Sequence, residues 1–167
     1  MISIDEKYMK EALKEAKKAY DIEEVPVGAV IVKNGKIIAR AYNQKETKGD
    51  TTKHAEILAI QKASKKTGDW RLEGCTMYVT LEPCSMCAGA LIQSRINSIC
   101  IGTPDEKTGA CGSVLNLLED YKFNHIVQVK KYILKEECKE IMQDFFKMLR
   151  KKKGEKKNGW AKKADYN

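Results

Sequence analysis

The sequence lacks any apolar stretch long enough to cross a membrane. Its unbroken apolar runs, such as residues 27–32, are short, whereas a spanning helix needs about 20 such residues. The first twenty residues alternate charged with apolar side chains and contain no hydrophobic stretch before a small-residue cleavage site, so they do not form a secretory signal. These absences predict a cytoplasmic protein without membrane association.

The sequence has little of the pattern that marks a disulfide framework or a zinc ribbon. Only Cys84 and Cys87 are closely spaced, and the other four cysteines are scattered singly, at Cys75, Cys100, Cys111 and Cys138. A zinc ribbon needs a second cysteine pair, and a thioredoxin-like redox site would place its C-x-x-C after the first strand of such a unit. In a chain of this size without a signal, cysteines more often serve as metal ligands or buried thiols.

Acidic residues are scarce at the C-terminal end of the chain. Residues 150–167 hold eight basic and two acidic residues, which is +6 of the total net charge of +8. The first 149 residues therefore carry only +2, in a length that suits one domain with its own core. We expect one globular domain over residues 1–150 and a basic, flexible C-terminal segment over residues 151–167. Charge alone leaves two interpretations of that segment open, a nucleic-acid contact or a solvated terminus.

The first half of the chain predicts a helix, a hairpin and a second helix. Ser3 and Glu6 form a capping box before a run with helical period. Two β-rich runs, residues 28–33 and 36–42, flank Asn34-Gly35, which suits a tight turn because both positions accept positive φ. A second helix is expected to be capped by Thr51 or Thr52, to carry His54 and Glu56 in its first turn, and to end near Gly68.

The second half predicts three strands and two helices. A strand over residues 76–81 precedes Pro83, which can occupy the first position of a helix over residues 84–92. Strands are expected over residues 98–101 and 126–129, and a closing helix carries an apolar stripe that includes Cys138, Phe145 and Phe146. No internal repeat is present. This order of elements predicts an α/β fold, with a mixed five-stranded sheet and helices on its faces.

Two of the predicted helix starts carry residues that suit a catalytic metal. Cys84 and Cys87 are spaced i, i+3, so both sulfurs project from one helix face, and a helix N-terminus favours the thiolate form. Zinc held by these thiolates and by His54 would keep a fourth position open for water. Glu56 is too close in sequence to His54 for a comfortable fourth ligand, but its carboxylate suits a general base. H-x-E followed by P-C-x-x-C is the signature of zinc-dependent nucleobase deaminases.

At these residues the sequence resembles the bacterial tRNA-specific adenosine deaminases, members of the cytidine deaminase-like superfamily. The resemblance runs from the first helix to about Arg150. The matching stretches are residues 25–30, 42–43, 54–56, 78–90, 94–96 and 105–110. The free-cytidine deaminases commonly have cysteine where His54 stands, and the riboflavin-pathway deaminases space their cysteines further apart, so both are less similar.

The resemblance implies a fold, an activity and further roles. It implies a three-layer α/β/α fold and a homodimer with one Zn²⁺ per subunit, held by His54, Cys84 and Cys87. The enzyme would convert adenosine to inosine at the wobble position of a tRNA anticodon, a hydrolysis that releases ammonia, with Glu56 moving the protons. Asn43 would orient the flipped base and Glu82 would shape the pocket. Candidates for contacts with the anticodon loop are Asp105, Lys107, Asn124, His125, Phe146 and Arg150.

Two other functions remain open from the sequence. A small-molecule deaminase, for which a guanine deaminase is the nearest type, would keep the zinc site and the glutamate but would have no use for basic flanks. A zinc-stabilised RNA-binding subunit without enzymatic activity would not need Glu56. The weaker candidates also have ordinary structural interpretations, since Asn43 suits a turn, Asn124 and His125 an exposed loop, and Phe146 a core position.

Overall fold

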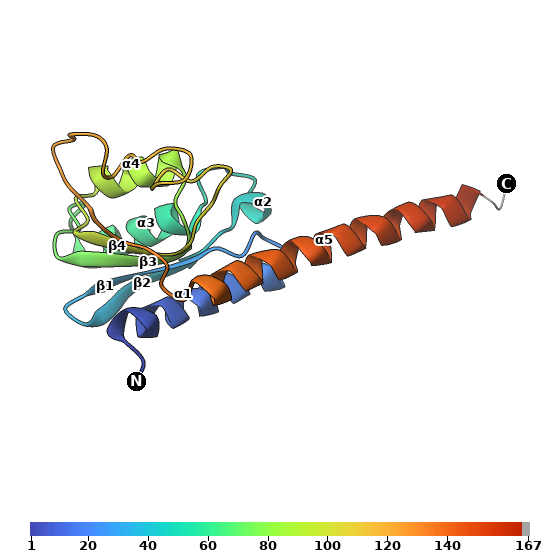
Figure 1. The fold of residues 1–167 in the computed structure, drawn as a ribbon, viewed down its shortest axis with the longest axis horizontal. Helices are drawn as coiled ribbons and strands as arrows, with labels where there is room; N and C mark the ends of the chain where they lie inside the picture. Colours follow the sequence, from blue (N-terminus) through green and yellow to red (C-terminus); the bar gives the residue numbers. More distant parts are fainter. Residues whose placement is uncertain (165–167) are drawn as a thin grey trace.

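A mixed five-stranded sheet lies between two layers of helices. The computed structural model describes the backbone of residues 1–164 and the side chains of residues 1–156. Helices α1 (Ile4–Asp21) and α5 (Lys135–Ala164) cover one face of the sheet, and helices α3 (Ala55–Thr67) and α4 (Ser85–Gln93) cover the other (Figure 1). A short helix, α2 (Lys45–Lys48), lies in the connection between β2 and α3. The predicted three-layer α/β/α fold is confirmed.

The strand order is β2-β1-β3-β4-β5. The strands are β1 (Gly28–Lys33), β2 (Lys36–Tyr42), β3 (Cys75–Leu81), β4 (Ser98–Thr103) and β5 (Gln128–Lys130). Strand β1 pairs antiparallel with both β2 and β3, whereas β3, β4 and β5 run parallel. The predicted hairpin is confirmed, with Asn34 at φ 50° and Gly35 at φ 72° as a tight turn requires. The carboxyl ends of β3 and β4 therefore share one edge of the sheet.

The first helix lies unusually close to the sheet. Its capping box is present, because the Ser3 hydroxyl accepts from the Glu6 N–H and the Glu6 carboxylate accepts from the Ser3 N–H. Where α1 crosses the start of β1, a Cβ added to Gly28 would lie 2.0 Å from the Ala12 carbonyl oxygen and 2.4 Å from the Ala16 nitrogen. Only glycine permits this approach of a helix backbone to a strand.

Two helices begin later than the sequence predicts. The second predicted helix, α3, starts at Ala55 with His54 as its N-cap, because Thr52 is used in a turn, where its N–H and hydroxyl both donate to Asp50. The threonine caps were therefore wrong, but the helix ends at Gly68 as predicted. Helix α4 starts at Ser85, one residue later than predicted, because Cys84 has extended backbone and is the N-cap.

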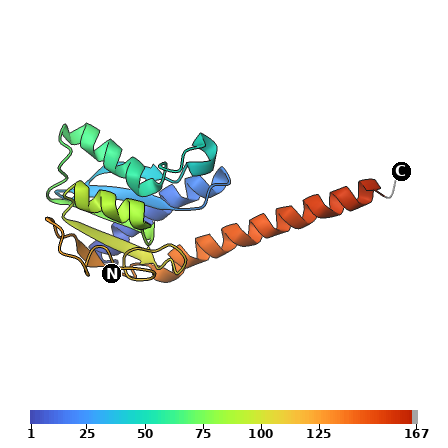
Figure 2. The same cartoon turned by 90° about the horizontal axis from the view of Figure 1, so that it is seen from above.

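Strand limits and the closing helix also differ from the prediction. Strand β5 starts at Gln128 rather than at residue 126, because its pairing with β4 begins opposite Ser98, and Ile126 is exposed. Helix α5 does not end near Arg150 but continues to Ala164, away from the sheet (Figure 2). The last three residues of the predicted basic segment lie outside the described residues. Among the described residues, no helix is long and apolar enough to span a membrane.

Candidate active site

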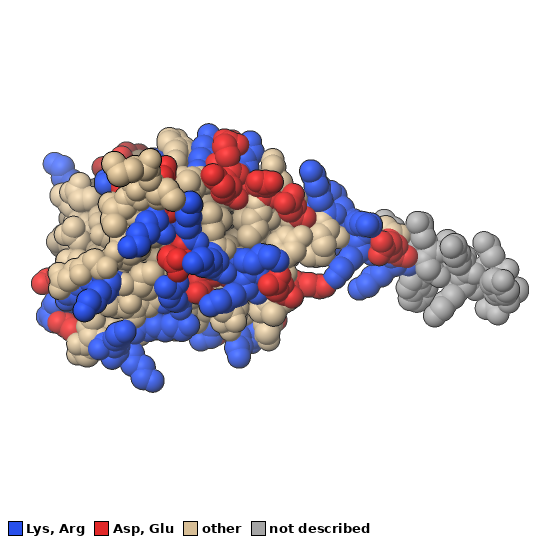
Figure 3. All heavy atoms as spheres, turned by 90° about the horizontal axis from the view of Figure 1, so that it is seen from below, with Lys and Arg blue, Asp and Glu red and all other residues tan. Residues whose placement is uncertain are grey.

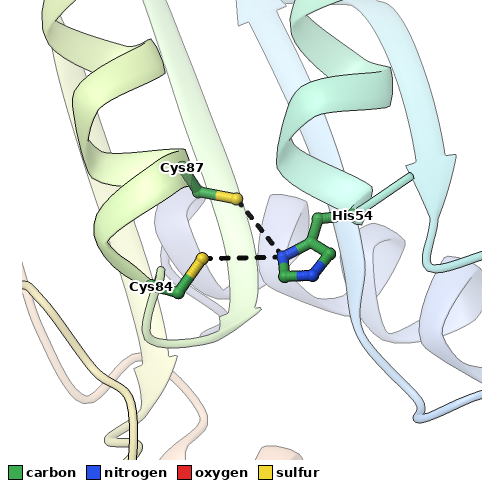
Figure 4. A group of neighbouring side chains, drawn as sticks. All are labelled: His54, Cys84 and Cys87. Atoms are coloured by element: carbon green, nitrogen blue, oxygen red, sulfur yellow. Dashed lines mark hydrogen bonds between the residues drawn. The ribbon is translucent and has the colours of Figure 1, made fainter. Parts of the chain in front are cut away.

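Two helix starts meet at the carboxyl end of β3. His54 is the N-cap of α3 and Cys84 is the N-cap of α4, each with extended backbone. Neither side chain caps its own helix. Both are therefore free to turn toward each other, and Cys87 joins them from the first turn of α4 (Figure 4). Residues about 30 positions apart in the sequence thus form one cluster.

The three donor atoms have the spacing of a zinc site. The Nδ1 atom of His54 lies 3.6 Å from the Sγ of Cys84 and 3.5 Å from the Sγ of Cys87. Tetrahedral zinc with bonds of about 2.3 Å to sulfur and about 2.0 Å to nitrogen would separate such atoms by about 3.5 Å. All three ligand atoms lie within 4.8 Å of one another. The donor set and its spacing fit a zinc ion, with Nδ1 as the nitrogen ligand.

One of the two thiols in the cluster, that of Cys84, is already favoured as a thiolate. The hydrogen bond between Cys84 and Cys87 lowers the pKa of the Cys84 thiol to about 4, and the hydrogen bond between Cys84 and His54 lowers it further. The same contact with Cys84, together with burial, raises the pKa of Cys87 far above its usual value. The hydrogen bond to Cys84 also raises the pKa of His54. Without metal, Cys84 and Cys87 therefore share one proton, and zinc binding would release that proton.

Glu56 lies beside this cluster in a cavity of about 190 Å³. It sits in the first turn of α3 and is 4% exposed, and burial raises the pKa of its carboxyl group. Within the described part of the chain, the group of candidate metal ligands contains His54, Cys84 and Cys87 but not Glu56. A buried carboxyl group next to a metal site, but outside the ligand set, suits proton transfer.

The walls of the cavity come from both halves of the chain. They include Val25, Val27, Asn43, Lys45, Leu81, Glu82, Asp105 and Thr108. The Asn43 amide donates to the Val25 carbonyl, and its oxygen accepts from the Lys45 N–H at 3.1 Å. These bonds fix the orientation of the Asn43 side chain at the cavity wall. The structure thus brings Asn43, Glu82 and Asp105 together with the cluster of His54, Cys84 and Cys87.

Glu82 holds the loop that follows β4. Its carboxylate accepts from the N–H groups of Asp105, Cys111 and Ser113, and also from the Ser113 hydroxyl. The loop passes so close that a Cβ on Gly109 would lie 2.1 Å from a Glu82 oxygen. Asp105 in turn accepts from the N–H groups of Lys107 and Thr108. Glu82 therefore shapes the cavity by fixing this loop.

Other candidates for RNA contact lie outside the cavity. The Lys107 side chain is exposed on the loop that Glu82 holds. The Asn124 side chain accepts a hydrogen bond from Arg95, and His125 Nε2 lies 2.7 Å from the Ile96 carbonyl oxygen. Arg95 and Ile96 follow the C-terminal end of α4, whereas Cys84 is at its N-terminal end. Phe146 and Arg150 lie on α5, where Phe146 is 40% exposed. Of the two neighbouring phenylalanines, it is Phe145 that belongs to the core.

Sequence reasoning missed the wall formed by α2. Glu24 is 1% exposed and accepts from the N–H groups of Glu46 and Thr47 and from the Thr47 hydroxyl. This carboxylate anchors α2 and thereby places Lys45 at the cavity. An acidic residue directly before the apolar run at Val25 was the available signal, but the partner helix is too short to show a periodic pattern.

Comparisons with known proteins agree with this geometry. The MafB19-like deaminase family model matches residues 4–150. A tRNA-specific adenosine deaminase of Bacillus subtilis is 54% identical over 149 residues, covering 89% of this chain and 92% of the relative. The chain belongs to the tRNA-specific adenosine deaminase family. A second relative, the tRNA-specific adenosine deaminase of Aquifex aeolicus, is 48% identical and covers 87% of this chain and 95% of its own length.

A solved structure extends the agreement from sequence to fold. It comes from a study of A-to-I editing by tRNA:A34 deaminases at the wobble position of transfer RNA. It superposes with a TM-score of 0.78 at 40% identity, covering 81% of this deaminase and 98% of the other chain. The family assignment made from the motifs is therefore confirmed by both sequence and structure.

Proposed function

We propose that this deaminase hydrolyses adenosine to inosine at the wobble position of a tRNA anticodon. The observation that carries the proposal is the buried Glu56 beside the His54, Cys84 and Cys87 cluster, in the lining of a cavity. Adenosine and water give inosine and ammonia, so no organic cofactor is needed. The tRNA substrate is supported by the relatives, which are named tRNA-specific adenosine deaminases.

One zinc ion per subunit would be held by His54, Cys84 and Cys87. When bound, zinc activates water for attack on a polarised carbon and stabilises developing negative charge. As the water oxygen attacks C6 of adenine, Glu56 accepts the proton that the water loses. Glu56 then returns protons to the ring nitrogen and to the leaving amine. Because the Glu56 carboxyl is buried, no bulk water competes for these transfers.

The substrate would be held by the cavity walls. Asn43, fixed by its two backbone hydrogen bonds, would orient the flipped base, and Glu82 would keep the loop carrying Asp105 and Lys107 in place. An anticodon loop suits this site because its bases are already unstacked, which lowers the cost of flipping. Asn124, His125, Phe146 and Arg150 would contact the anticodon loop, and the enzyme would act in the cytoplasm as a homodimer.

Sequencing of tRNA tests this function directly. The zinc-loaded enzyme is incubated with a tRNA pool and, in parallel, with free guanine, and conversion to inosine is detected because inosine is copied as guanosine. We expect conversion at the first anticodon position and no ammonia from guanine. Release of ammonia from guanine without editing of any tRNA would replace the proposal with a small-molecule deaminase.

A further inference from the structure

The C-terminal half of α5 projects away from the domain as a single helical arm. We call residues 150–164 the α5 arm. Two views at right angles both show it leaving the sheet and the other helices (Figures 1 and 2). At 1.5 Å per residue it extends about 20 Å, the axial length of several base pairs of a duplex. The family model ends at Arg150, so it does not include the arm.

The arm leaves the domain next to the catalytic cavity. The packed part of α5 ends near Phe145, which is buried and meets the ring of Tyr20 edge-on. About two turns further along the helix, Lys152 pairs with Glu23. Glu23 stands two residues before Val25, which lines the cavity. RNA whose target base occupied the cavity would therefore pass close to the root of the arm.

The described side chains of the arm carry charge and no apolar face. Residues 150–156 contain five basic residues, one glutamate and one glycine, and all are exposed. Lysine and arginine side chains gather at this root of the arm, next to fewer acidic side chains (Figure 3). The sequence adds Lys157, Lys162 and Lys163 further along the same helix, with Trp160 as the one large apolar residue. A membrane-surface helix or a helix that docks in a protein groove needs apolar anchors, and residues 150–156 have none.

We propose that the α5 arm binds phosphates of the RNA stem that adjoins the loop holding the target base. This inference rests on the proposed function. Backbone phosphates are the chemical partner that a row of exposed lysines recognises without reading sequence. The phosphates of the stem continue outward from the loop, as the arm continues outward from the edge of the cavity. The arm would therefore add affinity and orientation, while the chemistry stays at Glu56.

The salt dependence of RNA binding tests the arm. The variant Lys151→Gln, Lys153→Gln, Lys156→Gln removes three charges with little change in helix propensity, and it leaves the Lys152 ion pair intact. Its binding to an anticodon stem-loop RNA is titrated with salt, using the zinc-loaded full chain. Each lost phosphate contact removes about 0.7–0.9 from the slope of log affinity against log salt, so we expect a slope shallower by about 2. The KM should rise while kcat at saturating RNA is retained.

Two controls make the result specific to the arm and the stem. The variant Lys36→Gln, Lys65→Gln, Lys66→Gln removes the same charge from exposed positions at the opposite end of the sheet. It should keep the wild-type slope. With the same loop closed by a shortened stem, the arm variant and the wild type should bind equally. A wild-type slope in the arm variant, or an equal loss in the control variant, would overturn the proposal.

The outcome can be separated from that of the proposed function. Inosine formation in tRNA by the wild-type enzyme tests the function, whereas the binding slopes test the arm. Editing with unchanged slopes would reject the arm and keep the function. Shallower slopes without any editing would reject the function and show that the arm binds RNA. Binding of the wild type, but not the arm variant, to anionic lipid vesicles, with unchanged RNA slopes, would assign the arm to a membrane surface instead.

Discussion

His54 and Cys84 occupy the same structural position in two different helices. As N-caps, both have extended backbone, and neither side chain caps its helix, so both are available to the candidate metal site. The orphan N–H groups of the two helix starts point toward the same region, where they favour negative charge. Two thiolates can therefore be held beside His54 in this half-buried cluster.

Loss of one thiolate should remove the metal. In Cys87→Ala we expect less than one zinc per chain and a lower melting temperature, because three protein ligands define the site and bound metal stabilises the native state. Metal content by atomic absorption and thermal unfolding measure both. Cys75→Ala is the matched control, since Cys75 is also buried but starts β3 at the far end of the strand. A fully active enzyme without zinc would contradict the mechanism.

Glu56 should matter for turnover and not for binding. In Glu56→Gln we expect zinc content and RNA affinity to persist while kcat falls by at least about 10²-fold, the usual contribution of a general acid or base. Single-turnover kinetics and metal analysis check this result. Glu73→Gln, at an exposed position, should behave as the wild type. Near-normal turnover in Glu56→Gln would refute the assigned role.

At the scale of elements, α1 is fixed to the sheet by a polar cluster. Asp5 accepts from the Tyr78 hydroxyl at 2.8 Å and from Lys130 at 2.9 Å, which links the first turn of α1 to β3 and β5. Burial opposes ionisation of Asp5, but these hydrogen bonds outweigh it and hold the pKa of the carboxyl below its usual value. The ionised form of Asp5 thus stabilises the packing of α1.

This cluster predicts a dependence of stability on pH. A carboxyl with a lowered pKa in the folded state contributes stability above its unfolded pKa of about 3.9 and loses it as pH falls through the folded value. Asp5→Asn should therefore be less stable than the wild type at pH 7 and should show less loss of stability between about pH 5 and pH 2. Urea unfolding across this range measures the difference, with Asp69→Asn as an exposed control. Parallel curves for Asp5→Asn and the wild type would contradict the prediction.

The elements that the sequence predicted best are those with a strong local signal. The Ser3 capping box, the Asn34-Gly35 turn and the glycine at position 68 each determine backbone conformation within a few residues. The start of α3 was wrong because a turn at Asp50 competes for Thr52. Helix α2 was missed because a buried carboxylate distant in sequence, Glu24, holds it. Such long-range contacts leave no periodic pattern in the sequence.

The candidate site was predictable to the extent that it depends on spacing. The motif H-x-E with P-C-x-x-C identified the cluster of His54, Cys84 and Cys87, because this combination of residue types at this spacing is specific to the zinc-dependent deaminases. The residues of the cavity walls were harder to predict from the sequence. The role of Glu82 in fixing the loop after β4, and the presence of Lys45, depend on tertiary contacts that spacing does not encode.

At the scale of the whole molecule, one loop exposes several large apolar side chains. Between β4 and β5, Val114, Tyr121, Phe123 and Ile126 are each at least 45% exposed. Exposed apolar groups concentrated in one segment are typical of a surface that another chain covers. This feature supports the proposed homodimer, in which a second copy would cover the loop.

Sedimentation or light scattering of the purified chain should therefore show a dimer. The variant Phe123→Glu, Ile126→Glu places two charges on the exposed loop and should shift the equilibrium toward monomer, because a buried unpaired charge opposes association. Ile2→Glu, at an exposed position near the N-terminus, should remain dimeric. A wild-type chain that is monomeric and fully active would count against the homodimer.

The narrow contact at Gly28 has a consequence for how this enzyme tolerates change. The helix that presses on Gly28 lies behind the sheet, whereas the neighbouring Val27 faces the catalytic cavity. An added Cβ at Gly28 would displace either α1 or the start of β1, and a displacement of β1 would also move Val27 in the cavity wall. Gly28 does not line the cavity. It nevertheless helps to determine the dimensions of the cavity, because its lack of a side chain lets α1 pack closely behind the strand.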